Sequence, residues 1–140
     1  MRTDSVRISD QALDHVRGFI DGEFGGNYLP GKARQYKTGK KAQDAHEAIR
    51  PSDVERTPES VKESLTKDQY ALYDLIWRRF VSCQMQPARW NVTTLNIAAP
   101  TSVGLATYKA SGRILVFDGF TRVWSTSSNE QQLPLSLIHI

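Results

Sequence analysis

The sequence predicts an α+β protein in which a helical region is followed by antiparallel β-strands. In the first part of the chain, apolar residues recur every three or four positions, as they do on one face of a helix. After Pro87 the chain alternates and becomes rich in β-branched residues, which is typical of strands. Three regions follow from this change: a helical region at 1–85, a β region at 86–124, and a polar tail at 125–140 that we expect to be disordered.

The first predicted helix spans residues 9–24. Ser9 is a suitable N-cap, and Gly25-Gly26 supplies the stop. Its apolar stripe consists of Leu13, Val16, Ile20 and Phe24. This spacing predicts that one face of the helix is buried against the rest of the region.

Two further helices are expected before the β region. Thr57, followed by a proline at the first helical position, predicts a short helix over 58–64. Thr66 then caps a longer helix, over 67–84, whose aromatic face predicts core packing rather than a platform for stacked bases. The apolar residues of this helix are Tyr70, Leu72, Tyr73, Leu75, Ile76, Trp77, Phe80 and Val81. Because they cover much of its circumference, we expect the helix to be well buried.

A glycine-rich segment, 25–43, separates the first two helices and is expected to be a loop. Five basic residues follow one another in it without an intervening acidic residue: Lys32, Arg34, Lys37, Lys40 and Lys41. This run fits an arm that meets phosphates, and it fits a solvated basic loop equally well. A short helical or turn segment is predicted over 42–50, ended by Pro51.

Four strands are expected in the β region, at 88–98, 105–110, 114–117 and 120–124. Their predicted boundaries are a turn at Pro100-Thr101-Ser102, a break at Ser111-Gly112, and a turn or bulge at Asp118-Gly119. The chain ends on an apolar stub, 135–140, that has no cap or partner, and we expect this stub not to be native to the domain.

Composition narrows the class of protein. The 140 residues carry a formal net charge of +3 with a pI near 9.1, which permits nucleic-acid binding without requiring it. Cys83 is the lone cysteine, so an intrachain disulfide and a zinc knuckle are excluded and a reducing cytoplasm is expected. The chain lacks a membrane-length apolar run, a secretory signal and the motifs of P-loop, serine-hydrolase and zincin enzymes.

The N-terminal group Arg2-Thr3-Asp4-Ser5 has chemistry suited to a phosphate. It offers a guanidinium fork, two hydroxyls and a carboxylate just before a helix start, and Asp4 can orient Arg2. Spacing alone favours a simpler interpretation, in which these residues form a cap with a solvated arginine.

A second polar group consists of Asp44, His46 and Arg50. On a helix, His46 and Arg50 share a face, where the two side chains can hold a phosphate and the imidazole can also pass a proton. The alternative is a structural histidine, with Arg50 in a surface salt bridge, and spacing modestly favours it.

Three segments resemble consecutive parts of the bacterial type IA DNA topoisomerases. They are Met-Arg-Thr-Asp-Ser at 1–5, Ala-Gln-Asp-Ala-His-Glu-Ala-Ile-Arg-Pro at 42–51, and Leu-Ile-Trp-Arg-Arg-Phe-Val-Ser-Cys-Gln-Met at 75–85. The ten-residue segment around His46 is the most specific. The β region is similar to the long strands of that family's arch. The resemblance covers residues 1–124, and it implies a helical portion of the gate domain, which carries the cleavage site, followed by antiparallel strands of the arch.

The resemblance also implies an activity. In the family, a tyrosine before the Met-Arg-Thr-Asp-Ser segment attacks a phosphate of single-stranded DNA, and the enzyme relaxes negatively supercoiled DNA with Mg²⁺ and without ATP. Arg2 matches the arginine at the scissile phosphate, where it offsets developing charge. Thr3 and Asp4 match its neighbours, and His46 matches a histidine that helps bind the DNA backbone. Arg2 and His46 are thus the expected catalytic residues, and Arg50 is added as a phosphate-contact candidate.

The attacking tyrosine would stand before Met1, and the family binds its Mg²⁺ in an acidic domain outside the matching segments, so no metal site is expected in this chain. We therefore expect a fragment of a monomeric, cytoplasmic enzyme that acts on DNA and not at a membrane, and that cannot cleave DNA by itself. Two rival interpretations stay open. One is a non-catalytic module that binds single-stranded DNA, and the other is an inert, truncated product.

Overall fold

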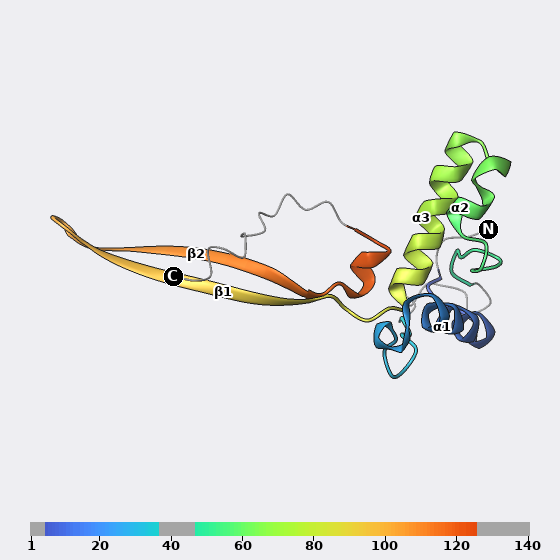
Figure 1. The fold of residues 1–140 in the computed structure, drawn as a ribbon, viewed down its shortest axis with the longest axis horizontal. Helices are drawn as coiled ribbons and strands as arrows, with labels where there is room; N and C mark the ends of the chain where they lie inside the picture. The colour runs from blue at the N-terminus through green and yellow to red at the C-terminus, as the bar shows by residue number, and fades with distance from the viewer. Residues whose placement is uncertain (1–4, 37–46, 126–140) are drawn as a thin grey trace. The chain divides into compact units, whose positions relative to one another are not determined.

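The computed structural model describes residues 5–36 and 47–125 (Figure 1). Its helices are α1 (Asp10–Phe24), α2 (Pro58–Val61) and α3 (Lys67–Cys83), with single 3₁₀ turns η1 (Gly26–Tyr28), η2 (Lys62–Ser64) and η3 (Gly119–Arg122). The strands are β1 (Arg89–Thr101) and β2 (Gly104–Phe117). Helices come first and antiparallel strands follow, which confirms the predicted α+β class.

The described residues group into two units. The helical unit takes its residues from Met1–Pro87 and Gly119–Ser125, and the β unit contains Ala88–Asp118. The chain therefore leaves the helical unit, forms the hairpin and rejoins the helical unit. None of the helices in the described part of the chain is long and apolar enough to span a membrane.

Helix α1 lies where the sequence predicted it. It follows the N-cap residue Ser9, and its buried residues are Ala12, Leu13, Val16 and Ile20. The helix ends at Gly25, whose φ of 94° is open to glycine and disfavoured for other residues. The side chain of Ser9 forms no capping bond to the helix; its hydroxyl instead donates to the Glu47 carboxylate.

Both other helices begin at the predicted caps. The Thr57 hydroxyl accepts the Ser60 N–H at 3.3 Å, and proline stands at the start of α2. Thr66 and Gln69 form a reciprocal capping box at the start of α3, in which each side chain accepts the other residue's N–H, at 3.4 and 2.9 Å. Such local signals depend only on neighbours in sequence, which is why they were predictable.

Helix α3 is less buried than predicted. Leu72 is 59% exposed and Leu75 is 51% exposed, so the expectation of burial around most of the helix is wrong. One face alone packs against the core, and it carries the buried Trp77, Phe80 and Val81. The prediction that the aromatic face serves core packing is confirmed.

The core of the helical unit joins residues that are distant in sequence. The buried cluster includes Ala12, Val16, Ile20, Val54, Trp77, Phe80, Val81, Met85 and Val123. The Trp77 indole N–H donates to the Val54 carbonyl oxygen at 2.8 Å, so the polar atom of this buried ring has a partner. The Phe19 ring meets Trp77 edge-on, with ring centroids 5.7 Å apart.

Strands β1 and β2 form a two-stranded antiparallel sheet whose register runs from Trp90 opposite Leu115 to Thr101 opposite Gly104. Two predicted boundaries inside this hairpin are wrong. Ser111-Gly112 does not break the second strand, because it pairs with Thr94 and Thr93, and the hydroxyls of Ser111 and Thr94 lie 3.2 Å apart. Pro100 belongs to β1, where an edge strand can accommodate a proline.

Residues 120–124 were predicted as a strand and instead contain the end of η3 and a turn. The Phe120 N–H donates to the Gln86 carbonyl oxygen at 2.8 Å. Gly119 has a φ of 50° and lies so close to the chain after α3 that a Cβ would stand 2.5 Å from the Gln86 oxygen. This close approach fixes the returning chain against the end of α3.

Gly119→Ala should destabilise the helical unit by about 2 kcal/mol or more, because the new methyl group meets main-chain atoms and the left-handed φ is strained. Urea unfolding of the 140-residue chain, followed by circular dichroism, measures the change. Gly22→Ala is the matched control: nothing lies within 4 Å of a Cβ at this helical position, so alanine should be neutral or stabilise by up to about 1 kcal/mol. Equal stability of the Gly119 variant and the wild type would contradict the close approach.

Candidate nucleic-acid interface

The structure describes the predicted phosphate-contact residues only in part. Four of them lie outside the described residues, and their roles stay predictions: Arg2, Thr3, Asp4 and His46. Arg50 is described, and so are the two stretches that directly follow the other four, residues 5–9 and 47–50. The geometry of these two stretches therefore bears on the predicted site.

Residues 47–50 lie against the segment that leads into α1. The Ala48 N–H donates to the Arg7 carbonyl oxygen at 2.7 Å. The Glu47 carboxylate accepts hydrogen bonds from the hydroxyl and the N–H of Ser9. The two stretches that directly follow the predicted phosphate contacts are thereby fixed to each other.

None of residues 47–50 is helical, so the helical alternative predicted for 42–50 is wrong for its described end. The remainder of that segment lies outside the described residues. The Ala48 N–H bonds across to another segment instead of closing a helical turn. The argument that a helix places His46 and Arg50 on one face therefore has no support in the described part of the chain.

Arg50 has protein partners in this structure. Its Nη2 lies 3.1 Å from Glu47 Oε2, and its Nη1 donates to the Pro51 carbonyl oxygen at 3.3 Å. The side chain is 27% exposed, and its Nε is buried without a hydrogen-bond partner in the part of the chain that the structure describes. Arg50 thus supports the fold of its own segment. Its predicted phosphate contact stays a prediction, in which a phosphate would have to compete with Glu47.

The environment of Glu47 favours its ionised form. The hydrogen bond from the Ser9 hydroxyl is the main cause that holds the pKa of Glu47 below its ordinary value. Partial burial opposes this effect, and Arg50 adds to it through a hydrogen bond and its charge. A negatively charged Glu47 therefore links the start of α1 to Arg50 at neutral pH.

The described part of the basic loop, residues 32–36, is held by a glutamine that sequence reasoning missed. Gln84 follows α3 and is fully buried. Its amide oxygen accepts the Arg34 N–H at 2.9 Å, and its amide nitrogen donates to the Arg34 carbonyl oxygen at 3.0 Å. These two bonds are those that a neighbouring strand would offer. Glutamine is ordinarily exposed, so the sequence carries no signal for this role.

Tyr36 and Cys83 lie beside Arg34 without forming an activated nucleophile. The Tyr36 hydroxyl donates to the Cys83 carbonyl oxygen at 2.9 Å and accepts a hydrogen bond from Arg34. Burial, and next the neighbouring Cys83, raises the pKa of Tyr36, although Arg34 and Arg79 oppose the shift. Burial also raises the pKa of the Cys83 thiol. Both groups therefore keep their protons at neutral pH, whereas a nucleophile needs a lowered pKa or an adjacent base.

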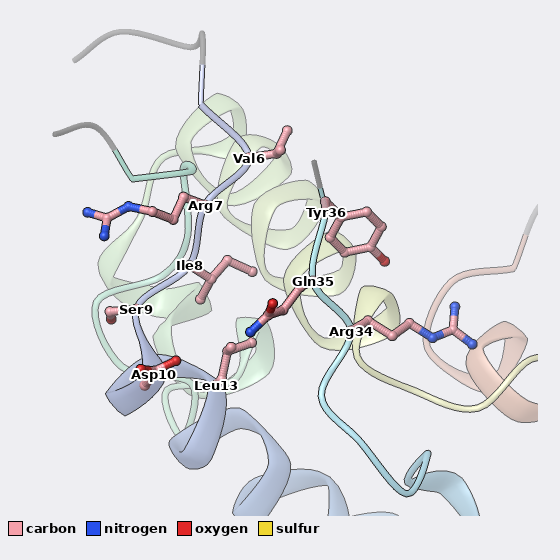
Figure 2. A pocket seen from close by; sticks show the side chains of 9 residues that line it. All are labelled: Val6, Arg7, Ile8, Ser9, Asp10, Leu13, Arg34, Gln35 and Tyr36. Carbon is pink, nitrogen blue, oxygen red and sulfur yellow. The ribbon is translucent and has the colours of Figure 1, made fainter. Parts of the chain in front are cut away.

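A first cavity, of about 280 Å³, lies between the chain that enters α1 and residues 34–36 (Figure 2). Figure 2 shows Ile8, Leu13 and Gln35 pointing toward one another in this space. Arg7 and Arg34 point away from it on opposite sides. The lining is therefore mixed: Ile8 and Leu13 are apolar, whereas Ser9, Asp10 and Gln35 are polar, and guanidinium groups flank the cavity.

A second cavity, of about 360 Å³, is lined by Tyr36, by Arg79 and Cys83 of α3, and by Phe120 and Trp124 after the hairpin. Arg34 lines it as well, and no carboxylate is among the described residues around it. The Arg79 guanidinium lies 5.5 Å from the centre of the Trp124 ring. Positive charge and aromatic surface are the two features with which proteins hold single-stranded nucleic acid.

One group among the described residues could hold a metal ion. The ligand atoms of His15, Asp53 and Glu55 all lie within 4.8 Å of one another. Asp53 already accepts the Glu55 N–H at 3.0 Å and pairs with Arg56 at 3.6 Å. Mg²⁺ prefers about six oxygen ligands, so this largely exposed set with an imidazole does not fit the Mg²⁺ expected for the resembling family.

Comparison with known proteins identifies relatives that match most of this chain. A family model described as DNA topoisomerase matches residues 1–138. The DNA topoisomerase 1 of Pseudomonas aeruginosa is 52% identical over 123 residues, and that of Escherichia coli is 50% identical over 123 residues. Each of these matches covers 88% of this chain and 14% of the relative.

A solved structure is also similar. Full-length topoisomerase I from Thermotoga maritima aligns with a TM-score of 0.72 and 37% sequence identity. The alignment covers 96% of this chain and 20% of that chain. This chain therefore spans a small part of the length of the proteins that it matches.

Gln84→Leu should release residues 32–36 from the end of α3. Two main-chain groups of Arg34 lose their partners, so we expect a loss of about 2 kcal/mol in the free energy of unfolding and faster tryptic cleavage after Arg34. Gln69→Leu is the control, since it removes an exposed capping box at a cost of about 1 kcal/mol and should leave cleavage after Arg34 unchanged. Unaltered cleavage in the Gln84 variant would show that the clamp does not order the segment.

The ionised Glu47 should make the docking of residues 47–50 depend on pH. Because its pKa is lowered in the folded chain, its charge stabilises the fold above the ordinary carboxyl pKa, and this contribution is lost as the pH falls through the folded value. Glu47→Gln should therefore lower stability at pH 7, and the difference from wild type should shrink below about pH 4. Urea unfolding of both proteins, from pH 7 to below about pH 4, measures the difference in their free energy of unfolding. The same change at the exposed Glu63 serves as control, and a pH-independent difference for Glu47→Gln would refute the role of the charge.

Proposed function

The chain belongs to the DNA topoisomerase family, and from this premise we propose that it forms the part of a type IA enzyme that carries the DNA-cleavage site, followed by strands of the arch. The proposal concerns the activity of a whole enzyme, since this chain spans 14% of the first relatives compared. The partner is DNA, in the form of a single-stranded segment of a negatively supercoiled duplex. The enzyme is proposed to act as a monomer in the bacterial cytoplasm.

The proposed reaction is the relaxation of negatively supercoiled DNA. A tyrosine hydroxyl loses its proton as its oxygen bonds to a phosphorus of one strand. The bond from that phosphorus to the 3′ oxygen of the preceding nucleotide breaks, and this oxygen takes up a proton. The products are a 5′-phosphotyrosyl link and a 3′-hydroxyl, which re-forms the phosphodiester after another strand has passed. The link keeps the phosphate activated, so ATP is not needed. Mg²⁺ would supply positive charge near the DNA phosphates, and we assign its ligands to other parts of the enzyme.

Within this reaction, residues of this chain are proposed to hold the phosphate. Arg2 matches the family arginine and would bind the scissile phosphate with its two-pronged guanidinium, where it offsets the charge that develops in the transition state. Thr3 and Asp4 would hydrogen-bond around it, with the carboxylate orienting the guanidinium. His46 would bind the neighbouring backbone phosphate, most strongly when its imidazole is protonated.

The observation that carries the proposal is the main-chain hydrogen bond from Ala48 to Arg7, at 2.7 Å. Ala48 stands two residues after His46, and Arg7 stands three residues after Asp4. Two segments separated by forty residues are therefore fixed together directly beyond the groups proposed to share one phosphate site. A solvated cap and an unrelated structural histidine would not need this connection.

Arg50 enters the proposal differently from the other residues. Its ion pair with Glu47, at 3.1 Å, keeps the segment after His46 in place. A direct phosphate contact would require the DNA phosphate to replace Glu47 as its partner. The pairing therefore makes Arg50 a DNA contact only in the bound enzyme, while in the free chain it positions its own segment.

A non-catalytic, single-stranded DNA-binding module is the second candidate function. The second cavity favours it, because two arginines and four aromatic residues surround a space that no described carboxylate lines. The two candidates differ in one property: only the first requires a covalent protein–DNA link.

A chimera tests the proposal. Residues 1–124 of this chain replace the matching segment of Escherichia coli DNA topoisomerase 1, which is 50% identical over 123 residues. We expect the chimera to relax a negatively supercoiled plasmid with Mg²⁺ and without ATP, and to leave protein on the 5′ end of the cleaved strand. Arg2→Ala in the chimera should slow relaxation by about a hundredfold, as loss of one group that stabilises transition-state charge does.

Arg56→Ala in the same chimera is the control, since Arg56 is 71% exposed and pairs with Asp53 on the surface. Its relaxation rate should equal that of the unmodified chimera. A chimera that melts cooperatively and binds single-stranded DNA, yet forms no covalent adduct, would refute the cleavage role and favour the binding module. Full activity of the Arg2 variant would refute the role assigned to Arg2 alone.

A further inference from the structure

We propose that the second cavity receives an unstacked base of single-stranded DNA, while Arg34 and Arg79 bind an adjoining phosphate. This inference rests on the proposed function, because it requires DNA at the helical unit. It goes beyond that function by naming a base-binding site and three contact residues, Arg34, Arg79 and Trp124, for which the phosphate-contact assignments above give no role.

The walls of the cavity are held in place by bonds that do not involve a ligand. Phe120 packs against the hydrophobic core, and its N–H is bonded to Gln86. The Trp124 N–H donates to the Phe120 carbonyl oxygen at 3.0 Å, which fixes the tryptophan to the same turn. Cys83 and Arg79 lie on the last turns of α3. A space of about 360 Å³ between such walls has the size of a site for a small molecule.

The Trp124 ring offers the stacking surface. Trp124 is partly exposed, and the Arg79 guanidinium lies 5.5 Å from its ring centre. In this structure the guanidinium thus lies over one face of the indole ring, which shows that this face accepts a flat group. A base is such a group, and every base can stack on an aromatic ring. Arg79 is itself exposed on α3, so it can leave the ring for a phosphate when a base takes its place.

The charge around the cavity selects an anion. Arg34 and Arg79 both line the cavity. The charges of both arginines oppose the rise in the pKa of Tyr36 and of Cys83, which agrees with both guanidinium groups lying near the same wall. No carboxylate among the described residues forms an ion pair with either arginine, in contrast to Arg50. The cavity therefore combines positive charge without a counter-charge among the described residues, an aromatic ring and a largely apolar lining. A nucleotide matches all three features, whereas a free phosphate would leave the apolar part unused.

The position of the cavity agrees with DNA bound at the proposed cleavage site. Val6 and Ala48 also line it, and they belong to the two stretches that follow the predicted phosphate contacts. A strand held by those contacts would therefore have one of its next bases within reach of Trp124. The residues that hold a phosphate and those that hold a base would thus contact one continuous strand.

Binding of two labelled oligonucleotides to the full chain tests the inference. The probes are an eight-nucleotide oligothymidine and the same backbone with abasic sites in place of its central bases. We expect the oligothymidine to bind at least about fivefold more tightly, and Trp124→Ala to abolish this preference, since one stacked base contributes at least this factor. Trp124→Phe should restore most of the preference. Trp90→Ala is the matched control and should leave this preference unchanged. Trp90 lies in the β unit, where the Arg113 guanidinium is 4.3 Å from the centre of its ring.

Arg79→Met provides a second test that does not disturb the core, since Arg79 is exposed. It should weaken both probes and reduce the slope of log affinity against log salt by about 0.7, the value for one lost phosphate contact on a single strand. Equal affinity of the chain for both probes, unchanged by Trp124→Ala, would overturn the base site. If Arg2→Ala weakened both probes in that case, the proposed function would stand. Binding of neither probe would overturn the inference together with the DNA contacts on which it rests.

Discussion

The arrangement of the helical unit depends on the hydrogen bonds at the C-terminal end of α3. The last carbonyl groups of a helix have no partner within it, so they are free to bind other segments. Here the Cys83 carbonyl oxygen accepts the Tyr36 hydroxyl, and the buried Gln84 side chain pairs with both main-chain groups of Arg34. Residues 32–36, which have no regular secondary structure, thereby acquire a defined course. Arg34 is thus held beside the second cavity, which Arg79 also lines.

Gln86 extends the same principle to the chain on both sides. Its N–H donates to Tyr28 at 2.7 Å, its side chain donates to Leu29 at 3.1 Å, and its carbonyl oxygen accepts the Phe120 N–H at 2.8 Å. The close approach of Gly119 is the steric counterpart of these bonds. Each such bond contributes about 1 kcal/mol, so the course of the segments around the cavities rests on a small number of hydrogen bonds. Order in the candidate interface is therefore set by residues that need not touch DNA.

The parts of the fold that the sequence predicts are those fixed by neighbours along the chain. Thr66 and Gln69 cap α3 because they stand three residues apart, and the stripe of α1 follows from helical spacing. The errors arise where distant segments decide the outcome. Gly112 continues a strand because β1 offers it a partner, and Leu72 is exposed because nothing described packs over that side of α3. The candidate site shows the same division: the resemblance indicates Arg2 and His46, whereas the clamp by Gln84 has no pattern in sequence.

Net charge says little about DNA binding in this chain, whereas the partners of each arginine say more. Arg78 donates to Asp74 at 2.6 Å and to the Val123 carbonyl oxygen at 3.1 Å, and Arg50 is paired with Glu47. A phosphate at either residue must displace a carboxylate, so part of the attraction is lost to the broken pair. Arg34 and Arg79 have no carboxylate partner among the described residues, so a phosphate bound there as proposed would not have to displace one of those carboxylates. The net charge of +3 therefore does not say where an anion would be attracted. That depends on which arginines the fold has already paired with a carboxylate.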